Sequence, residues 1–448
     1  MSRQKEIDML NGPLGGRLIL FALPIAASSM FQQLFNAADT AVVGKFADAD
    51  ALAAVGTNGE IVALMVSLSI GLAVGTNVLL ARLIGSGKKD KVNEAVHTSL
   101  MLAIIIGVIG ALAGQIAARP VLMLIDTPDS ILELAVEYLK IYFVGYPALL
   151  VYDFGSAILR ANGDSRRPFV ILILSGAANL LLNLFFVIVC KMGVTGVAAA
   201  TDIATLISAV MVVVLLMREK GEFRFDIRRM GLNGGYVAEL LKIGIPAALQ
   251  GAVFCFANIF VQAAVNSFGA AATAGSAIAM NFEYFGYYMI TAFGQAATTF
   301  TSQNYAAGNN DRCRRILVLC IIDSIIFSAI VIVPLVVFRS GACALFSSDA
   351  NVIEEACLRI MTILVFECVC GIYEVPAGYL RGMGYSSAPA VTTIIGTCLV
   401  RIGWIETVFR VHHVRRVLFA VFPLSWVITS VLMWGVMIFI LGRKKLSK

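Results

Sequence analysis

Charged residues are scarce in this chain. Asp, Glu, Lys and Arg make up 14% of its 448 residues, against roughly 25% in an ordinary soluble domain. Hydrophobic residues take their place, at 59% of the chain with a mean hydropathy of +0.87. This composition excludes an ordinary soluble protein and indicates one built largely inside a membrane. The net charge of +6 gives no indication of nucleic-acid binding.

Signals of catalysis and of cofactor binding are also missing. The three histidines (His97, His412 and His413) lack zinc-ligand spacing, and Gly85–Lys88 only superficially suggests a phosphate-binding loop. The nine cysteines are scattered without zinc or disulfide spacing, so we expect them to pack as small apolar residues. We therefore expect no catalytic residues and no cofactor. A protein without a nucleotide site that moves a solute must draw its energy from an ion gradient.

The apolar residues fall into twelve runs of the length that a membrane-spanning helix needs, about 20 residues. The first run follows a polar segment and precedes no small-residue cleavage site, so we expect it to be retained as a span. The runs begin near Leu18, Ala51, Val92, Ala135, Phe169, Gly196, Val237, Ala274, Arg314, Ile353, Pro389 and Leu418.

The basic residues predict the orientation of these spans. If the N-terminus is cytoplasmic, most of the 34 lysines and arginines fall in cytoplasmic segments, as the positive-inside rule requires. Only the outer loop with Arg410, Arg415 and Arg416 runs against this bias. We expect a multi-pass protein of the cell (inner) membrane with both termini in the cytoplasm.

The chain repeats itself once. Residues 159–168 (LRANGDSRRP) recur 221 positions later as residues 380–389 (LRGMGYSSAP), with Leu, Arg, Gly, Ser and Pro in step. Because each half has six spans, both halves enter the membrane from the same side, so the repeat is parallel about a pseudo-twofold axis. We expect an all-α fold with an N-terminal lobe at 1–217, a cytoplasmic linker at 218–236 and a C-terminal lobe at 237–448. Pro24 and Pro246 open the first span of each half, and we expect them to act as hinges.

Asp39 is the sharpest candidate for a functional residue. It lies inside the first span, and no basic residue follows it before Lys45. A carboxylate is costly inside a membrane, and without a cation it either takes up a proton or binds Na⁺. The alternative is a side chain satisfied by neighbouring hydroxyls. The repeat places Val261 opposite Asp39, so an ion site built on this acid belongs to the first half alone.

Other polar residues inside the spans are candidates for the ion site. Asn179 and Asn183 are four residues apart and so share one helix face. Their amides can supply oxygen ligands, or they can simply join helices. Thr201 and Asp202 are adjacent, and adjacent residues point about 100° apart on a helix, so they cannot face the same site.

A second group of polar residues is a candidate for a substrate cavity. Asp153 and Glu374 occupy matched positions in the two halves, as do Asn36 and Asn258. Two matched acids facing one axis would attract cations. The alternative is that each acid pairs with an arginine such as Arg401.

Several motifs together resemble the multidrug and toxic-compound extrusion (MATE) family, and the resemblance covers essentially the whole chain. It is closest to the bacterial branch of DNA-damage-inducible transporters. The motifs are Pro24, the segments 36–44 (NAADTAVVG), 51–56 (ALAAVG) and 303–308 (QNYAAG), and both LRxxGxSxxP turns.

The resemblance implies two six-helix bundles around a V-shaped cavity, which export cationic amphipathic compounds in exchange for Na⁺ or H⁺. The family's ion site corresponds here to Asp39, Asn179, Asn183 and Thr201. Asn183 is an amide where many relatives carry a second carboxylate, which favours H⁺ over Na⁺, and no metal other than Na⁺ at Asp39 is expected. We expect a monomer that contacts membrane lipid, takes a small-molecule substrate and binds no nucleic acid.

Two other functions remain open from the sequence. A flippase for lipid-linked precursors belongs to the wider superfamily, but it should carry several basic residues in its spans, and in the spans expected here we count one, Arg401. A polytopic membrane enzyme would need a clustered set of catalytic residues at the membrane surface, which is not visible.

Overall fold

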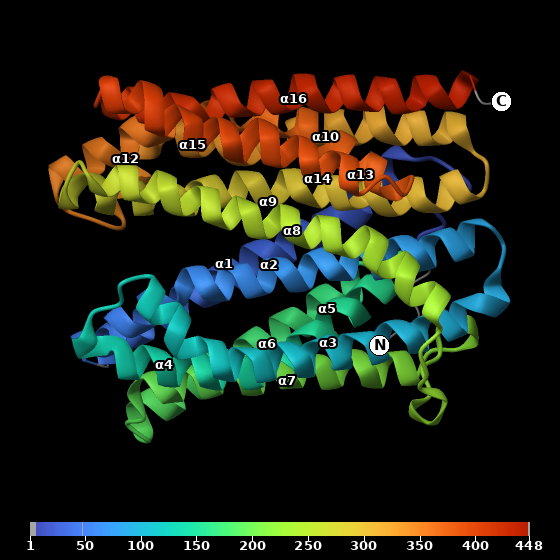
Figure 1. Cartoon of the computed structure of the whole chain (residues 1–448), viewed down its shortest axis with the longest axis horizontal. Helices are drawn as coiled ribbons and strands as arrows, with labels where there is room; N and C mark the ends of the chain where they lie inside the picture. Colours follow the sequence, from blue (N-terminus) through green and yellow to red (C-terminus); the bar gives the residue numbers. More distant parts are fainter. Residues whose placement is uncertain (1–5, 47, 447–448) are drawn as a thin grey trace. The chain divides into compact units, whose positions relative to one another are not determined.

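The computed structural model describes residues 6–46 and 48–446, and these residues form helices and connecting turns without a strand (Figure 1). Residues 1–5, 47 and 447–448 lie outside the described residues, and they include some of the lysines and arginines that predict the orientation of the spans. The all-α prediction is confirmed.

Each half of the chain contributes six long helices or helix stacks. The first half comprises α1 (Gly15–Phe46), α2 (Ala49–Gly85), α3 (Lys89–Leu124), the pair α4 (Asp129–Val144) and α5 (Tyr146–Ala161), α6 (Arg166–Leu184) with the π-helical turn η1 (Phe185–Val189), and α7 (Gly193–Met217). The second comprises α8 (Gly234–Asn266), α9 (Ala270–Ala306), α10 (Asn310–Val337), α12 (Ala350–Thr362) with η4 (Leu364–Cys370) and α13 (Gly371–Gly382), a stack from α14 (Ser387–Thr393) through η5 (Ile394–Leu399) and α15 (Val400–Trp404) to η6 (Ile405–Phe409), and α16 (Arg415–Leu446). A short helix, α11 (Arg339–Ala344), follows α10.

Most of these helices are long and apolar enough to cross a membrane. Within the described residues, ten pass this test alone, and the pair α4 and α5, bent by 44°, counts as an eleventh. The remaining helix of the expected twelve is α9. Its 37 residues give ample length, but its many Ser, Thr, Asn and Gln residues make it too polar to be recognised by composition.

The repeated turn of the sequence is a repeated turn of the backbone. Gly163 and Gly384, which occupy the same place in the two copies, have φ of 88° and 91°. Only glycine adopts this left-handed conformation without strain, which explains why the repeat keeps glycine there. Irregular turns also recur at matched places: the bend between α4 and α5 matches the 3₁₀ segment η4, and η1 matches η6, whereas η5 has no counterpart among the described residues of the first half.

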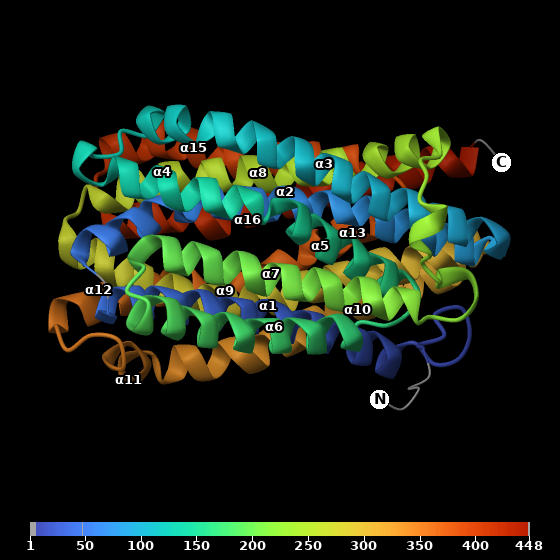
Figure 2. The ribbon, with the colours of Figure 1, turned by 90° about the horizontal axis from the view of Figure 1, so that it is seen from below.

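The first compact unit contains residues 1–7 and 27–248. Its helices α6 and α7 lie side by side (Figures 1 and 2). The first section of α8 packs on α2, where Gly71 and Gly75 allow close approach: a Cβ at either glycine would overlap the α8 backbone at Ala248 or Leu240. The Gly-x-x-x-Gly spacing on α2 is therefore explained by helix packing.

The second compact unit contains residues 8–26 and 249–448. Here the first section of α1 packs with the second half, since the rings of Phe21 and Phe300 on α9 are 5.5 Å apart. The segment before α1 is fixed to the same unit by Asn304, which donates to the Met9 carbonyl at 3.0 Å. The units thus differ from the lobes expected at 1–217 and 237–448, because the chain changes unit within α1 and within α8, two residues after Pro24 and Pro246.

Candidate ion-binding site and buried charges

Four residues of α1, α6 and α7 form one chain of hydrogen bonds in the first unit. Asn183 Nδ2 donates to Asp39 Oδ1 at 2.5 Å and to Asn179 Oδ1 at 2.7 Å. Asn179 Nδ2 in turn donates to Thr201 Oγ1 at 3.3 Å. The structure therefore brings together all four residues that the sequence suggested for ion coupling.

Local sequence explains this arrangement. Asn179 and Asn183 are one turn apart near the end of α6, so both amides point from one face. Asp39 is half-buried, and none of the described basic side chains forms an ion pair with it. The carboxylate depends on amide donors alone, which is a poor substitute for a positive charge.

One atom of the cluster has no partner. Asn183 is fully buried, yet its Oδ1 accepts no hydrogen bond from the described residues. An unmade hydrogen bond in a buried place is costly, so such an atom needs an explanation. Together with Asp39 and Thr201 it supplies carboxylate, amide and hydroxyl oxygens, the ligand types that hard cations such as Na⁺ prefer.

The acid next to Thr201 points elsewhere. Asp202 accepts a hydrogen bond from the backbone N–H of Gly145, at the bend between α4 and α5. A Cβ at Gly145 would overlap the Asp202 carboxylate, so this contact requires glycine. No local sequence pattern predicts this role, because the two residues are far apart along the chain and their contact depends on the bend.

At the matched place in the second unit, the described residues form no such cluster. Val261, which the repeat places opposite Asp39, is a buried apolar residue. Asn258 accepts a hydrogen bond of 3.3 Å from Arg401 Nη1. An ion site in the first half alone, as expected from the sequence, stays a prediction.

Both acids suggested for a substrate cavity, Asp153 and Glu374, have a side-chain partner within their own unit. Asp153 is buried and accepts from Ser69 Oγ at 2.6 Å. Glu374 forms an ion pair of 3.4 Å with an arginine, as in the alternative left open by the sequence, but the partner is Arg381 and not Arg401. Asn36 lies on an exposed face of α1. No hydrogen bond joins Asn36 to Asp153, or Asn258 to Glu374, among the described residues.

Arg401 is a buried arginine without a carboxylate partner among the described residues. It is 1% exposed, and its guanidinium lies 4.3 Å from the ring of Phe422 and 5.4 Å from that of Phe254. Its hydrogen bonds go to Ser425 and Asn258, both at 3.3 Å. The ring of Phe254 stacks in turn on Tyr287 at 6.3 Å. The positive charge is therefore held by aromatic faces and neutral oxygens.

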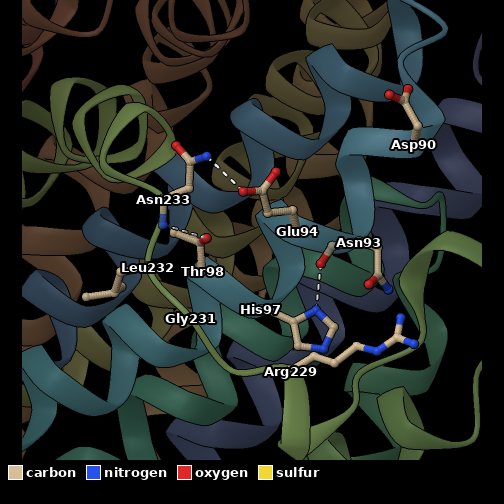
Figure 3. A pocket seen from close by; sticks show the side chains of 9 residues that line it. All are labelled: Asp90, Asn93, Glu94, His97, Thr98, Arg229, Gly231, Leu232 and Asn233. Carbon is tan, nitrogen blue, oxygen red and sulfur yellow. Dashed lines mark hydrogen bonds between the residues drawn. The ribbon is translucent and has the colours of Figure 1, made fainter.

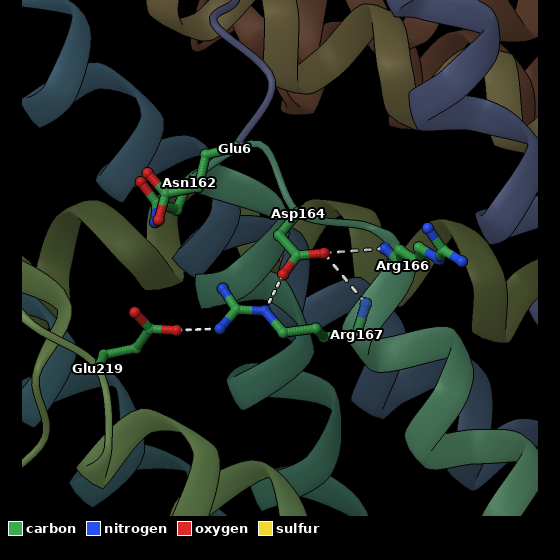
Figure 4. Close-up of polar contacts among 6 residues, drawn as sticks. All are labelled: Glu6, Asn162, Asp164, Arg166, Arg167 and Glu219. Carbon is green, nitrogen blue, oxygen red and sulfur yellow. Dashed lines mark hydrogen bonds and ion pairs between the residues drawn. The ribbon is translucent and has the colours of Figure 1, made fainter. Parts of the chain in front are cut away.

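The first copy of the repeated turn is fixed by charge (Figure 4). Asp164 accepts from the backbone N–H groups of Arg166 and Arg167, each at 3.0 Å, and so caps the start of α6. Arg167 pairs with Asp164 and with Glu219, which lies just after α7. Asn162 donates to Glu6 at 2.9 Å. These contacts connect the turn to the chain that follows α7 and to Glu6, all within the first unit.

The linker between the halves lies against the start of α3 and borders a pocket of about 370 Å³ (Figure 3). His97 Nε2 accepts from the backbone N–H of Asp226 at 2.9 Å, so Nδ1 carries the proton given to the Asn93 carbonyl at 2.7 Å. Asn93 donates to the Arg224 carbonyl at 2.7 Å. His97, for which the sequence suggested no role, therefore fixes the linker.

Comparison with known proteins identifies the family. The MatE family model matches residues 24–185 and again residues 246–404. The two matches start at the paired prolines, which confirms that the chain contains one unit twice.

Similar proteins cover nearly the whole chain. It is 24% identical over 440 residues to "Probable multidrug resistance protein YoeA" of Bacillus subtilis, covering 96% of this chain and 94% of that protein. It is 26% identical over 397 residues to the "FAD transporter" of Shewanella oneidensis, covering 87% and 86%. A solved outward-facing multidrug resistance MATE family transporter of the MOP superfamily has the same fold, with a TM-score of 0.89, 21% identity and coverage of 100% and 99%. The chain therefore belongs to the MatE family of multi-pass membrane transporters, and it is a transporter and not an enzyme.

Proposed function

We propose that the protein is a secondary efflux antiporter, which exports small amphipathic molecules in exchange for H⁺ or Na⁺ by rocking of its two halves. The single observation that carries the coupling proposal is the Asp39–Asn183–Asn179–Thr201 cluster. It combines a carboxylate with a buried amide oxygen, and within the described part of the chain the first has no basic partner and the second accepts no hydrogen bond. A proton or Na⁺ bound there would satisfy both groups.

The setting of the transporter is part of the proposal. The distribution of basic residues supports an inner-membrane protein with both termini in the cytoplasm. We propose a monomer that contacts lipid and takes its small-molecule substrate, cationic in the first instance, from the cytoplasm. The names of relatives such as YoeA support multidrug export.

Replacement of Asp39 tests the coupling. Asp39→Asn keeps the shape and the hydrogen bond from Asn183 but removes the titratable charge. We expect normal folded yield and a loss of ion-driven export of at least tenfold, measured as substrate flux in proteoliposomes under an imposed H⁺ or Na⁺ gradient. Asp50→Asn, at an exposed position of α2, is the matched control. Export by Asp39→Asn at the rate of the control would remove Asp39 from the mechanism.

A second candidate concerns the charge of the substrate. Arg401 places an unpaired positive charge next to stacked aromatic rings, which suits an aromatic compound that carries an anionic group. One relative is named as a transporter of FAD, which has an aromatic ring system and a pyrophosphate. On this reading Arg401→Gln would lower export of FAD and spare a cationic dye, whereas Arg401→Lys would retain part of the FAD flux. Equal loss of both substrates would indicate a structural role for Arg401.

A further inference from the structure

The second unit contains a buried ion pair that is complete in itself. Arg359 on α12 donates Nε and Nη2 to the two carboxylate oxygens of Glu283 on α9, at 2.7 and 2.8 Å. Its third nitrogen donates to Ser276 at 2.5 Å. The guanidinium also lies 5.4 Å from the rings of Phe419 and Phe422. Every side of Arg359 is thus occupied, and Glu283 already accepts two charged hydrogen bonds.

A third ionisable group lies beside this pair without a partner of its own. Glu367, on η4, is 3% exposed, and its Oε2 has no hydrogen-bond partner among the described residues. This oxygen lies against Gly286 of α9, since a Cβ there would overlap it. Gly286 is one turn from Glu283 on α9. The carboxyl group of Glu367 therefore lies beside the part of α9 from which Glu283 projects.

The elements packed around η4 bring one further cation close to it among the described residues, since Arg401 lies 4.3 Å from the ring of Phe422 that Arg359 also contacts. Along η4 itself, Glu367 is followed by the thiols of Cys368 and Cys370, and on α13 Glu374 is already paired with Arg381. On α10, Asp323 is a further acid, next to the Ser324 hydroxyl that lies near Gly371. The α16 side presents the rings of Phe419 and Phe422. Around η4 the four described acids, Glu283, Glu367, Glu374 and Asp323, therefore outnumber the three arginines, Arg359, Arg381 and Arg401.

The chemistry of this arrangement favours a bound proton. If Glu283 and Glu367 were both ionised, two buried carboxylates would compete for the guanidinium of Arg359, and an unpaired buried charge is strongly disfavoured. A sodium ion would need several oxygen ligands, but the surroundings of Glu367 Oε2 include the Gly286 backbone and the side chain of Ile332. A protonated carboxyl needs neither a counter-charge nor a coordination shell.

The backbone at this place is also unusual. Residues 364–370 form a 3₁₀ segment within a span that is otherwise α-helical, and such segments often mark hinges. A change in the charge of Glu367 would therefore act directly on an irregular turn between α12 and α13.

We propose that Glu367 is a proton-binding site of the second unit, and that Glu283 and Arg359 form the ion pair which its ionisation disturbs. When Glu367 holds its proton, Glu283 is the one carboxylate that pairs with Arg359. When the proton leaves, Arg359 is shared between two carboxylates. The site lies in a different unit from Asp39, so proton binding at Glu367 does not depend on the coupling role proposed for Asp39.

Infrared difference spectroscopy of the full-length protein in lipid vesicles tests this proposal. A pH step from mildly acid to alkaline should remove a C=O stretching band of a protonated carboxylic acid. Because a protonated Asp39 contributes to the same band, the comparison is made in the Asp39→Asn background. There we expect Glu367→Gln to remove intensity from the band and the control Glu354→Gln, at an exposed residue of α12, to leave it unchanged. An unchanged band in Asp39→Asn/Glu367→Gln would overturn the proposal, as would a Glu367 component that Na⁺ abolishes at constant pH.

Thermal unfolding provides a second readout that does not depend on transport. Glutamine resembles the neutral acid, so Glu367→Gln should unfold at the wild-type temperature under acid conditions and at a higher temperature than wild type under alkaline conditions. Equal destabilisation of Glu367→Gln at both pH values would indicate that the ionised form is the native one, which contradicts the proposal. Loss of export in Asp39→Asn with the Glu367 band intact would separate the two sites.

Discussion

A single amide decides how much negative charge the Asp39 cluster holds. Asn183 supplies two donated hydrogen bonds to its neighbours and keeps its own oxygen unpaired. In Asn183→Asp, two carboxylates would face each other, and like charges this close are tolerated only with a bound cation or a shared proton. We expect export by this variant to depend more steeply on Na⁺ than export by wild type, measured at a fixed pH gradient. Asn309→Asp, at an exposed position before α10, is the control, and steep Na⁺ dependence of the wild type would contradict the preference for H⁺.

At the residue scale, members of the hydrogen-bonded cluster are predictable where the signal is local, while their role in ion coupling stays a prediction. The position of Asp39 in an apolar run singles it out, and their spacing on one helix singles out Asn179 and Asn183. The partners of Asp153, Asp202 and Glu367 could not be predicted in the same way. These contacts join residues that are distant along the chain, such as Ser69 with Asp153, and they depend on which helices pack together.

At the scale of elements, the bend between α4 and α5 depends on a contact with α7. Gly145 gives its N–H to Asp202 and has no room for a side chain. Gly145→Ala should therefore destabilise the protein by about 1–3 kcal/mol, the usual cost of overpacking. Thermal unfolding in detergent measures this loss. Gly59→Ala on α2, where no atom lies within 4 Å of the new Cβ, should be neutral or stabilising.

The pair Gly145→Ala and Asp202→Ala separates crowding from loss of the hydrogen bond. If crowding is the cause, the double variant should be less destabilised than the sum of the single variants, since residues in contact are not additive. Strict additivity would mean that Asp202 does not restrict the bend.

Helix positions were predictable from apolar runs, but helix irregularities were not. Twelve runs were expected, and the described residues form twelve corresponding helices or stacks. The 3₁₀ segment η4 and the π-helical turns η1, η5 and η6 follow from small shifts in backbone hydrogen bonding. Such shifts depend on packing against neighbouring helices, which hydropathy and helix period do not report.

At the scale of the whole molecule, the repeat and the compact units describe different divisions of the chain. The repeat divides it at the linker, and the family model matches each half once. The compact units change within α1 and α8, because the first section of each helix packs with helices of the other half. A boundary drawn from charge at 218–236 cannot detect this exchange, since both helices are continuous and apolar through it.

The paired prolines, Pro24 and Pro246, each lie two residues before the point at which the chain changes unit. Proline inside a helix removes one hydrogen bond and costs about 3 kcal/mol, so alanine should stiffen α1 or α8 without harming folding. If these positions are the hinges of a rocking transporter, Pro24→Ala and Pro246→Ala should keep folded yield and thermal stability but slow substrate export several-fold in proteoliposomes. Pro334→Ala is the matched control, since this proline lies inside α10 and away from either unit boundary. Equal slowing in all three variants would attribute the effect to helix stiffness in general, and unchanged export in the first two would exclude these prolines as hinges.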